Sequence, residues 1–208
     1  MKIIAHRGFW IKESEKNTLE ALKRAIDNGF GFETDYRDYC GNIVISHNIP
    51  QGSEPTAEDV FALLNKFKMS EMPLAINVKA DGLQDKLNDL LHKYNIENYF
   101  LFDMSIPDTI GYINNGMSIA TRHSEYEKEF PFYAQSTTVW LDCFVDDWID
   151  EDIIQMHLSN CKNVCIVSPD LHKRPYINVW EKYKIINSEQ LMICTDYPLE
   201  ADNFFNKK

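Results

Sequence analysis

Two carboxylates near the start of the chain, Glu33 and Asp35, have the spacing of a metal-binding pair. They stand two positions apart in a mostly apolar stretch, and residues two apart on a β-strand point to the same face of the sheet. Two carboxylates at one level repel each other unless a cation lies between them. Because oxygen ligands suit hard cations, the pair favours Mg²⁺ or Ca²⁺. A solvated strand end beside Arg37 is equally compatible with the spacing.

Two histidines in the same part of the chain could carry out proton transfer. His6-Arg7-Gly8 follows the first apolar stretch, and His47 ends a later one. The Arg7 guanidinium offers a planar set of donors for phosphate oxygens, and Gly8 lets the backbone approach a ligand closely. Two imidazoles that titrate near neutral pH can accept and donate protons on opposite sides of a phosphorus atom. A lone histidine at a strand end is more often structural, so the hypothesis requires both.

Short apolar stretches that alternate with helix-like stretches must position these residues. The predicted strands are residues 2–6, 31–36, 74–79, 99–103, 118–122, 139–144, 164–168 and 191–195, with 43–47 extending the second strand as a hairpin. The predicted helices include residues 18–28, 83–94, 107–115, 150–159 and 180–186. Eight strands, most of them followed by a helix, predict an α/β fold, a compact (β/α)₈ TIM barrel, with residues 1–208 as a single domain. We expect a loop or a reduced helix at 124–137, which Pro131 interrupts.

Polar residues recur where the predicted strands end. They are His6, Arg7, Glu33, Asp35, His47, Asn77, Lys79, Asp103, Arg122, Asp142, Ser168, Asp170 and Asp196. Strands give way to polar loops in any fold, so one or two such residues would indicate nothing. A full ring with paired carboxylates, two histidines and a lysine favours an active site at the C-terminal face of a barrel. Trp140 shares the strand parity of Asp142 and lies either at this face or, as is commoner, in the core.

The charge of the chain limits its partners. The formal net charge is −11, from 21 Lys and Arg against 32 Asp and Glu. A field of this sign repels nucleic acids and anionic membrane surfaces, so we expect a small-molecule partner. It also repels phosphate, so a phosphate site here needs local positive charge from a metal ion and a few Arg or Lys. A basic stretch at residues 168–174 either closes over an anionic group or is a charged loop.

The cysteines and the start of the chain favour a cytoplasmic location. The five cysteines are scattered, which is typical of reduced core residues in a cytosolic protein. The chain runs directly from Met1 into the first predicted strand, with no apolar run long enough for a signal peptide or a transmembrane segment.

An ordered set of motifs connects these residues to a known family. The motifs are Ile4-Ala5-His6-Arg7-Gly8, Asn17-Thr18-Leu19-Glu20-Ala21, Gly31-Phe32-Glu33-Thr34-Asp35 and Val44-Ile45-Ser46-His47, followed by the looser Leu74-Ala75-Ile76-Asn77-Val78-Lys79 and Cys194-Thr195-Asp196-Tyr197-Pro198. In this order they resemble the glycerophosphodiester phosphodiesterases, which are TIM-barrel enzymes of the phosphatidylinositol-phospholipase-C-like superfamily. The resemblance covers the whole chain and is strongest in the first fifty residues.

The resemblance implies a role for each matched residue. It makes His6 and His47 the acid–base pair, Arg7 and Lys79 the phosphate-binding residues, and Glu33, Asp35 and Asn77 the ligands of one Mg²⁺ or Ca²⁺ ion. The implied activity is hydrolysis of a glycerophosphodiester-like substrate.

Three departures from the family pattern affect this interpretation. The third metal ligand is usually acidic, but this chain has Asn77, so Asp81 or Asp103 could supply the missing carboxylate. Asn48 follows His47 where the family commonly has Asp, which removes a local carboxylate that would orient the imidazole. The family's insertion after the hairpin, which helps to enclose glycerol, is reduced to residues 49–72.

Two other functions are compatible with the sequence. One is a cyclising, lyase-type phosphodiesterase or phospholipase that acts on a lipid-linked or polysaccharide-linked phosphodiester and stops at the cyclic product. The other is a degenerate barrel that binds a phosphorylated ligand without turnover, which Asn77 would favour. The presence of both histidines argues against a pure binding protein, which needs no acid–base pair.

Overall fold

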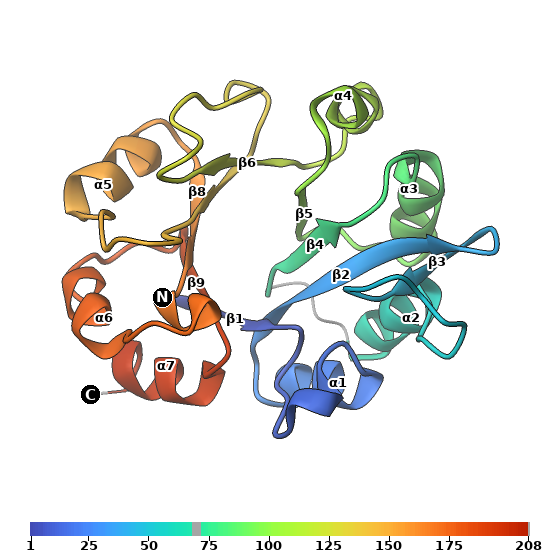
Figure 1. The fold of residues 1–208 in the computed structure, drawn as a ribbon, viewed down its shortest axis with the longest axis horizontal. Helices are drawn as coiled ribbons and strands as arrows, with labels where there is room; N and C mark the ends of the chain where they lie inside the picture. The colour runs from blue at the N-terminus through green and yellow to red at the C-terminus, as the bar shows by residue number, and fades with distance from the viewer. Residues whose placement is uncertain (68–71, 208) are drawn as a thin grey trace.

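The fold is a ring of parallel strands surrounded by helices (Figure 1). It is known from a computed structural model, which describes residues 1–67 and 72–207. The parallel strands are β1 (Lys2–His6), β2 (Gly31–Tyr39), β4 (Leu74–Val78), β5 (Tyr99–Phe102), β6 (Ala120–His123), β7 (Thr138–Leu141), β8 (Asn163–Val167) and β9 (Leu191–Thr195).

The hydrogen-bonded neighbours follow the order β5-β4-β2-β1-β9-β8-β7-β6. The ring approaches closure between β5 and β6, where the backbone N–H of Leu101 donates to the carbonyl of Ser118 at 2.9 Å. Strand β3 (Asn42–Ile45) pairs antiparallel with β2, as the predicted hairpin requires. This nearly closed barrel of eight parallel strands confirms the predicted (β/α)₈ fold.

Seven α-helices in the described parts of the chain pack around the ring. They are α1 (Leu19–Asp27), α2 (Ala57–Phe67), α3 (Gln84–Lys93), α4 (Ile106–Asn114), α5 (Glu151–Ser159), α6 (Ile177–Tyr183) and α7 (Pro198–Phe205), with short 3₁₀ helices η1 (Glu13–Glu15) and η2 (Pro169–His172). Helices α2 and α7 were not predicted. Helix α2 occupies much of the reduced segment 49–72, of which 68–71 lie outside the described residues. The β6–β7 connection forms turns without an α-helix, which confirms the expected loop.

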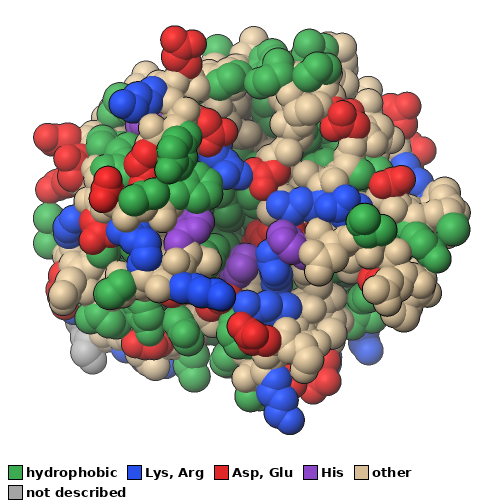
Figure 2. Space-filling view, viewed as in Figure 1, with side chains coloured by type: hydrophobic (Ala, Val, Ile, Leu, Met, Phe, Trp, Pro, Cys, Tyr) green, Lys and Arg blue, Asp and Glu red, His purple; other side chains and the backbone are tan. Residues whose placement is uncertain are grey.

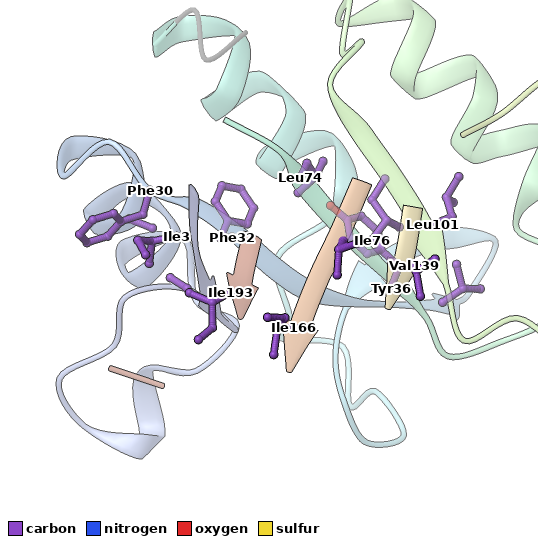
Figure 3. Close-up of a cluster of buried hydrophobic side chains, with 14 of the residues drawn as sticks. Ile3, Phe30, Phe32, Tyr36, Leu74, Ile76, Leu101, Val139, Ile166 and Ile193 are labelled. Atoms are coloured by element: carbon purple, nitrogen blue, oxygen red, sulfur yellow. The ribbon is translucent and has the colours of Figure 1, made fainter. Parts of the chain in front are cut away.

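The main core lies between the outer face of the barrel and the helices. Outward-pointing strand residues in it include Ile3, Phe32, Ile76, Val139, Ile166 and Ile193, each at most 1% exposed (Figure 3). Full burial of an aliphatic side chain contributes about 1.5–3 kcal/mol, so this layer is the main source of stability and fixes the strands that carry the site.

A second apolar cluster fills the inside of the barrel. Its members are Ile4, Ala75, Phe100, Phe102, Ala120, Trp140, Cys165, Val167, Met192 and Cys194. Trp140 stacks on Phe102 with ring centroids 4.1 Å apart, so it is a core residue. Five members of this cluster are followed, two residues later in the chain, by a polar residue that points the same way. These polar residues are His6, Asn77, Arg122, Asp142 and Asp196. The apolar interior therefore ends in a polar layer at the C-terminal face of the barrel.

Two further observations concern the whole chain. All five cysteines are free: Cys143, Cys165 and Cys194 are buried, while Cys40 and Cys161 are exposed. In the described ranges, no helix is both long and apolar enough to cross a membrane.

Candidate active site

Strand register sets His6, Glu33, Asp35 and Asn77 side by side. His6 pairs with Glu33 between β1 and β2, and Asp35 pairs with Asn77 between β2 and β4. Glu33 and Asp35 are 1% and 0% exposed, so neither is a solvated strand end. Figure 2 shows a hollow at the centre of one face of the molecule, with histidine, basic and acidic side chains around it.

Arg7 contacts both carboxylates of the predicted pair. Its backbone N–H donates to Glu33 Oε2 at 3.1 Å, and its Nε lies 3.0 Å from Asp35 Oδ2. Its Nη2 lies 2.8 Å from His47 Nδ1. The φ of Arg7 is 56°, a left-handed conformation that is uncommon outside glycine. Such backbone strain concentrates at functional sites, where surrounding contacts maintain it.

Gly8 brings the backbone close to helix α1. A Cβ at this position would lie 2.8 Å from the carbonyl carbon of Ala21 and 2.9 Å from the nitrogen of Leu22. Gly8 also has a left-handed φ of 86°, which glycine adopts without penalty. We expected Gly8 to let the backbone approach a ligand, but the close approach that it allows is to α1. This packing against α1 fixes the turn that carries Arg7.

His6 is held by Asp196, a partner that the sequence did not assign. His6 Nδ1 lies 2.6 Å from Asp196 Oδ1 at the end of β9, and Lys16 Nζ lies 3.5 Å from Asp196 Oδ2. The other ring nitrogen of His6, Nε2, lies 3.9 Å from Glu33 Oε2. The signal for Asp196 was its place after the last strand, because closure of a barrel sets the last strand beside the first.

His47 takes its carboxylate neighbour from β2. Its Nδ1 lies 3.3 Å from Asp35 Oδ1 as well as 2.8 Å from Arg7 Nη2. Asp35 thus supplies the carboxylate that Asn48 does not. Nδ1 can accept from Arg7 only when it carries no proton and can donate to Asp35 only when it carries one, so the two contacts exclude each other in any one tautomer of the ring.

Asn17, in the loop just before helix α1, bonds Asp35. Its Nδ2 donates to Asp35 Oδ2 at 2.9 Å, while its Oδ1 accepts from Thr34 Oγ1 at 2.6 Å. Asn17 is buried and has a left-handed φ of 63°. The motif Asn17-Thr18 contained this residue, but Thr18 is the N-cap of α1, and an Asn beside a cap gives no indication of a contact with a strand.

The three candidates for the third metal ligand differ in their contacts. Asn77 Nδ2 donates to Glu33 Oε1 at 3.0 Å, and within residues 1–67 and 72–207 its buried Oδ1 has no hydrogen-bond partner. Asp81 instead accepts from the Ser105 hydroxyl, and Asp103 pairs with Lys79 and Arg122. The described residues contain no group of three or more His, Cys, Asp or Glu placed to hold a metal ion. Among the three candidates, only Asn77 contacts Glu33 directly in the described structure.

Lys79 links the carboxylate pair to a chain of charges around the barrel mouth. Its Nζ lies 3.7 Å from Asp35 Oδ1 and 3.2 Å from Asp103 Oδ2. Asp103 also pairs with Arg122, whose Nη1 lies 3.6 Å from Asp142 Oδ2. These alternating contacts hold Lys79 and Arg122 in place.

Burial and neighbouring charges shift the pKa values of the carboxylates. Burial, and then the charge of Asp35, raises the pKa of Glu33. Burial would also raise the pKa of Asp35, but Arg7, the Asn17 hydrogen bond and Lys79 outweigh it and lower that pKa. The pKa of Asp196 is lowered too, because the contact with His6 outweighs burial. The centre thus holds one carboxylate that favours ionisation and one whose ionisation is opposed.

His6 and Arg7 open into a cleft of about 770 Å³. Its walls come from the loops after β1, β8 and β9, and they include Trp10, Lys16 and Tyr176. The stretch 168–174 contributes Asp170, Leu171, Lys173 and Arg174 to this wall. Arg174 also donates to the carbonyl of Cys143 at 2.7 Å.

The comparisons with known proteins identify the fold. No protein-family model matches the sequence, and the comparison with curated proteins found no match. Among solved structures, a glycerophosphodiester phosphodiesterase from Agrobacterium tumefaciens matches with a TM-score of 0.74 at 14% identity, over 98% of each chain. A glycerophosphoryl diester phosphodiesterase from Parabacteroides distasonis matches with a TM-score of 0.70 at 14% identity, over 98% of this chain and 85% of that one. A Ca²⁺-dependent phosphatidylinositol-specific phospholipase C from Streptomyces antibioticus matches with a TM-score of 0.57 at 9% identity, over 100% of this chain and 96% of that one.

The protein is therefore a (β/α)₈ barrel with a polar, partly buried centre at the C-terminal ends of its strands. Its fold is that of the glycerophosphodiester phosphodiesterases, as the sequence resemblance predicted.

Proposed function

We propose that the chain is a metal-dependent phosphodiesterase that cleaves a glycerophosphodiester-like substrate with His6 and His47 as its acid–base pair. The observation that carries the proposal is the position of Arg7, which contacts Glu33, Asp35 and His47 and follows His6 in the chain. A phosphate bound by this guanidinium would lie between the carboxylate pair and the imidazoles. The shared fold supports the same class of reaction.

The residues at the centre fit a hard divalent cation. Glu33 and Asp35 offer carboxylate oxygens, and the buried Asn77 Oδ1, which has no hydrogen-bond partner among the described residues, offers an amide oxygen. We expect Mg²⁺ or Ca²⁺ to bind there. When bound, the cation would neutralise phosphate oxygens and stabilise the charge that develops on them.

The two histidines can act through their Nε2 atoms. With its proton on Nδ1, His6 donates to Asp196 at 2.6 Å and leaves Nε2 free to accept a proton from the nucleophile. In the tautomer whose Nδ1 accepts from Arg7, His47 carries its proton on Nε2, from which it can protonate the leaving alkoxide. Arg7 and Lys79 would hold the phosphate between them.

The nucleophile is either water or a neighbouring hydroxyl of the substrate. Attack by water releases an alcohol and a phosphomonoester directly. Attack by the hydroxyl forms a cyclic phosphate, releases the alcohol and leaves hydrolysis of the ring as a second step. The same acid–base pair serves both routes, and ³¹P NMR of the product separates them.

His6→Ala and His47→Ala test the acid–base assignment. Each should lower turnover of a glycerophosphodiester such as sn-glycero-3-phosphoethanolamine by about 10²-fold or more in the presence of Mg²⁺ or Ca²⁺, which is the usual contribution of a general acid or base. Turnover is measured by ³¹P NMR, and thermal unfolding of each variant checks that the fold is retained.

His92→Ala is the matched control, because His92 is an exposed histidine of α3. It should retain full activity. If either site variant turned over the substrate as fast as the wild-type protein does, the two-histidine mechanism would be wrong.

A further inference from the structure

An apolar groove of about 430 Å³ adjoins the cleft that His6 and Arg7 line, which is called the catalytic cleft below. Its walls are the loop after β1, with Phe9, Trp10 and Ile11, and the start of α7, with Pro198 and Leu199. The groove and the catalytic cleft share Trp10, Asp196 and Tyr197 as lining residues. The groove therefore begins beside Asp196, the partner of His6, and runs between the loop after β1 and helix α7.

The groove exposes large apolar side chains to water. Ile11 is 67% exposed, and Tyr197 and Leu199 are each 44% exposed. Apolar side chains gathered in one groove mark a place where an apolar group binds. Ligand pockets of this kind typically have volumes of about 300–1,000 Å³, so the groove is large enough for a chain of several methylenes.

The wall of the groove is held in place without a ligand. Arg24 of α1 donates to the carbonyl of Phe9 at 2.7 Å and pairs with Glu15 at 2.9 Å, and Glu15 in turn accepts from the N–H of Ile11 at 2.9 Å. On the other side, Tyr197 stacks on Tyr176 with ring centroids 5.2 Å apart. These contacts hold the backbone of the loop and the ring of Tyr197, which lowers the cost of ordering the groove when a ligand binds.

Where the groove meets the cleft, Trp10 and Lys16 offer polar groups that could contact the ester oxygens of a phosphodiester. The buried indole Nε1–H of Trp10 has no acceptor in the described part of the chain. Lys16 Nζ lies 4.4 Å from the centre of the Trp10 ring. A donor and a cation at the boundary match the oxygens of an ester or alcohol group that joins a phosphate to an apolar chain.

We infer that the groove binds an alkyl or acyl chain carried by one alcohol of the substrate phosphodiester. The inference rests on the proposed function and names its substrate class: an amphiphilic phosphodiester with one apolar substituent. A single chain fits better than an anionic membrane surface, because Asp196 and Glu200 line the groove and the net charge is −11.

A series of sn-glycero-3-phosphate esters of ethanol, butanol, hexanol and octanol, used below their micelle concentrations, tests the inference. For the wild-type protein, kcat/KM should rise about two- to fourfold per methylene until the groove is filled. Leu199→Asp should flatten the dependence and leave kcat/KM for the ethyl ester within about twofold. An aspartate in the first turn of α7 is favoured by the helix dipole, so the fold should be retained.

Ile177→Asp is the matched control. Ile177 starts α6, is 41% exposed and does not line the groove, so this variant should keep the wild-type dependence on chain length. Equal kcat/KM for all four esters would overturn the inference and leave the proposed function standing. An increase that appeared only above the micelle concentration would also overturn it, in favour of binding to a lipid surface.

Calorimetry with octyl phosphate and ethyl phosphate separates this inference from the proposed function. If no ester is hydrolysed, the proposed function fails, and the groove is then judged by binding alone. Octyl phosphate should bind at least about tenfold more tightly than ethyl phosphate, and Leu199→Asp should remove the difference. Equal affinities, or sedimentation that shows a dimer which Leu199→Asp dissociates, would mean that the groove does not bind the chain of a substrate.

Discussion

At the scale of single residues, Asn77 determines the charge of the candidate metal site. It bonds Glu33 through Nδ2, while its Oδ1 is buried and has no partner in the described residues. With Asn77 in place of an acid, the ligand set carries two negative charges instead of three. Because affinity for hard cations rises with ligand charge, we expect the site to bind Mg²⁺ weakly.

Asn77→Asp should therefore tighten Mg²⁺ binding by about tenfold or more, because it adds a charge at nearly the same volume. Asn77→Leu should weaken binding, because it removes the ligand atom. Calorimetric Mg²⁺ titration of both variants measures the change, and Asp81→Ala serves as the control that should leave affinity unaltered. Unchanged affinity in both Asn77 variants would mean that Asn77 is not a ligand.

At the scale of elements, α5 packs on the β6–β7 connection through a buried histidine. His157 of α5 is 0% exposed, its Nε2 lies 3.0 Å from His123 Nδ1 at the end of β6, and its Nδ1 lies 3.0 Å from the hydroxyl of Tyr133. Burial, with a smaller contribution from His123, lowers the pKa of His157 to about 4. This contact holds the one barrel connection, among those described, that forms turns but no helix.

The low pKa of His157 should make the fold sensitive to acid. The folded state keeps the ring neutral while the unfolded chain protonates it near pH 6.5, so stability is complete above about pH 6.5 and falls as the pH drops towards 4. The loss from this group is about 3 kcal/mol at most. Urea unfolding at pH 7 and pH 4.5 should show a smaller loss for His157→Gln than for the wild-type protein. The exposed control His92→Gln should behave as wild type, and an equal loss in all three proteins would contradict the prediction.

The elements that could be predicted from the sequence are those with strong periodicity and clear boundaries. The eight parallel strands followed from their apolar runs, and the helix predicted at residues 18–28 is α1, which ends at Asp27 with Asn28 as its C-cap. Helices α2 and α7 carried usable signals that were missed. Thr56 Oγ1 accepts from the N–H of Asp59 at 3.1 Å at the start of α2, and α7 begins at Pro198, a residue suited to the first helical turn.

At the scale of the whole molecule, closure of the barrel assembles the site. Glu33 and Asp35 could be predicted as a pair because they belong to one strand. Asp196 could be placed in the polar ring, and its nearness to His6 follows only once the last strand is known to pair with the first. The contact of Asn17 with Asp35 could not be predicted, because it depends on the path of the loop before α1. The different contacts of Asn77, Asp81 and Asp103 could not be predicted either, because all three follow or lie in neighbouring strands.

Closure of the barrel also gathers positive side chains at one place, although the net charge of the chain is −11. Arg7, Lys16 and Lys79 converge on the barrel mouth, each beside a carboxylate that fixes its position. In a molecule that repels anions at long range, these local cations and a bound metal would have to supply the attraction for phosphate. Dependence on a divalent cation is therefore the property on which the proposed function rests most heavily.

Removal and return of the metal tests that property most directly. The protein is treated with EDTA, exchanged into metal-free buffer, and assayed with sn-glycero-3-phosphoethanolamine by ³¹P NMR, alone and after addition of Mg²⁺ or Ca²⁺. Turnover should be at least about 10²-fold lower without metal and should recover when one of the two cations is added. Undiminished turnover in the metal-free protein, or no turnover with either cation, would contradict the assignment of a metal-dependent phosphodiesterase.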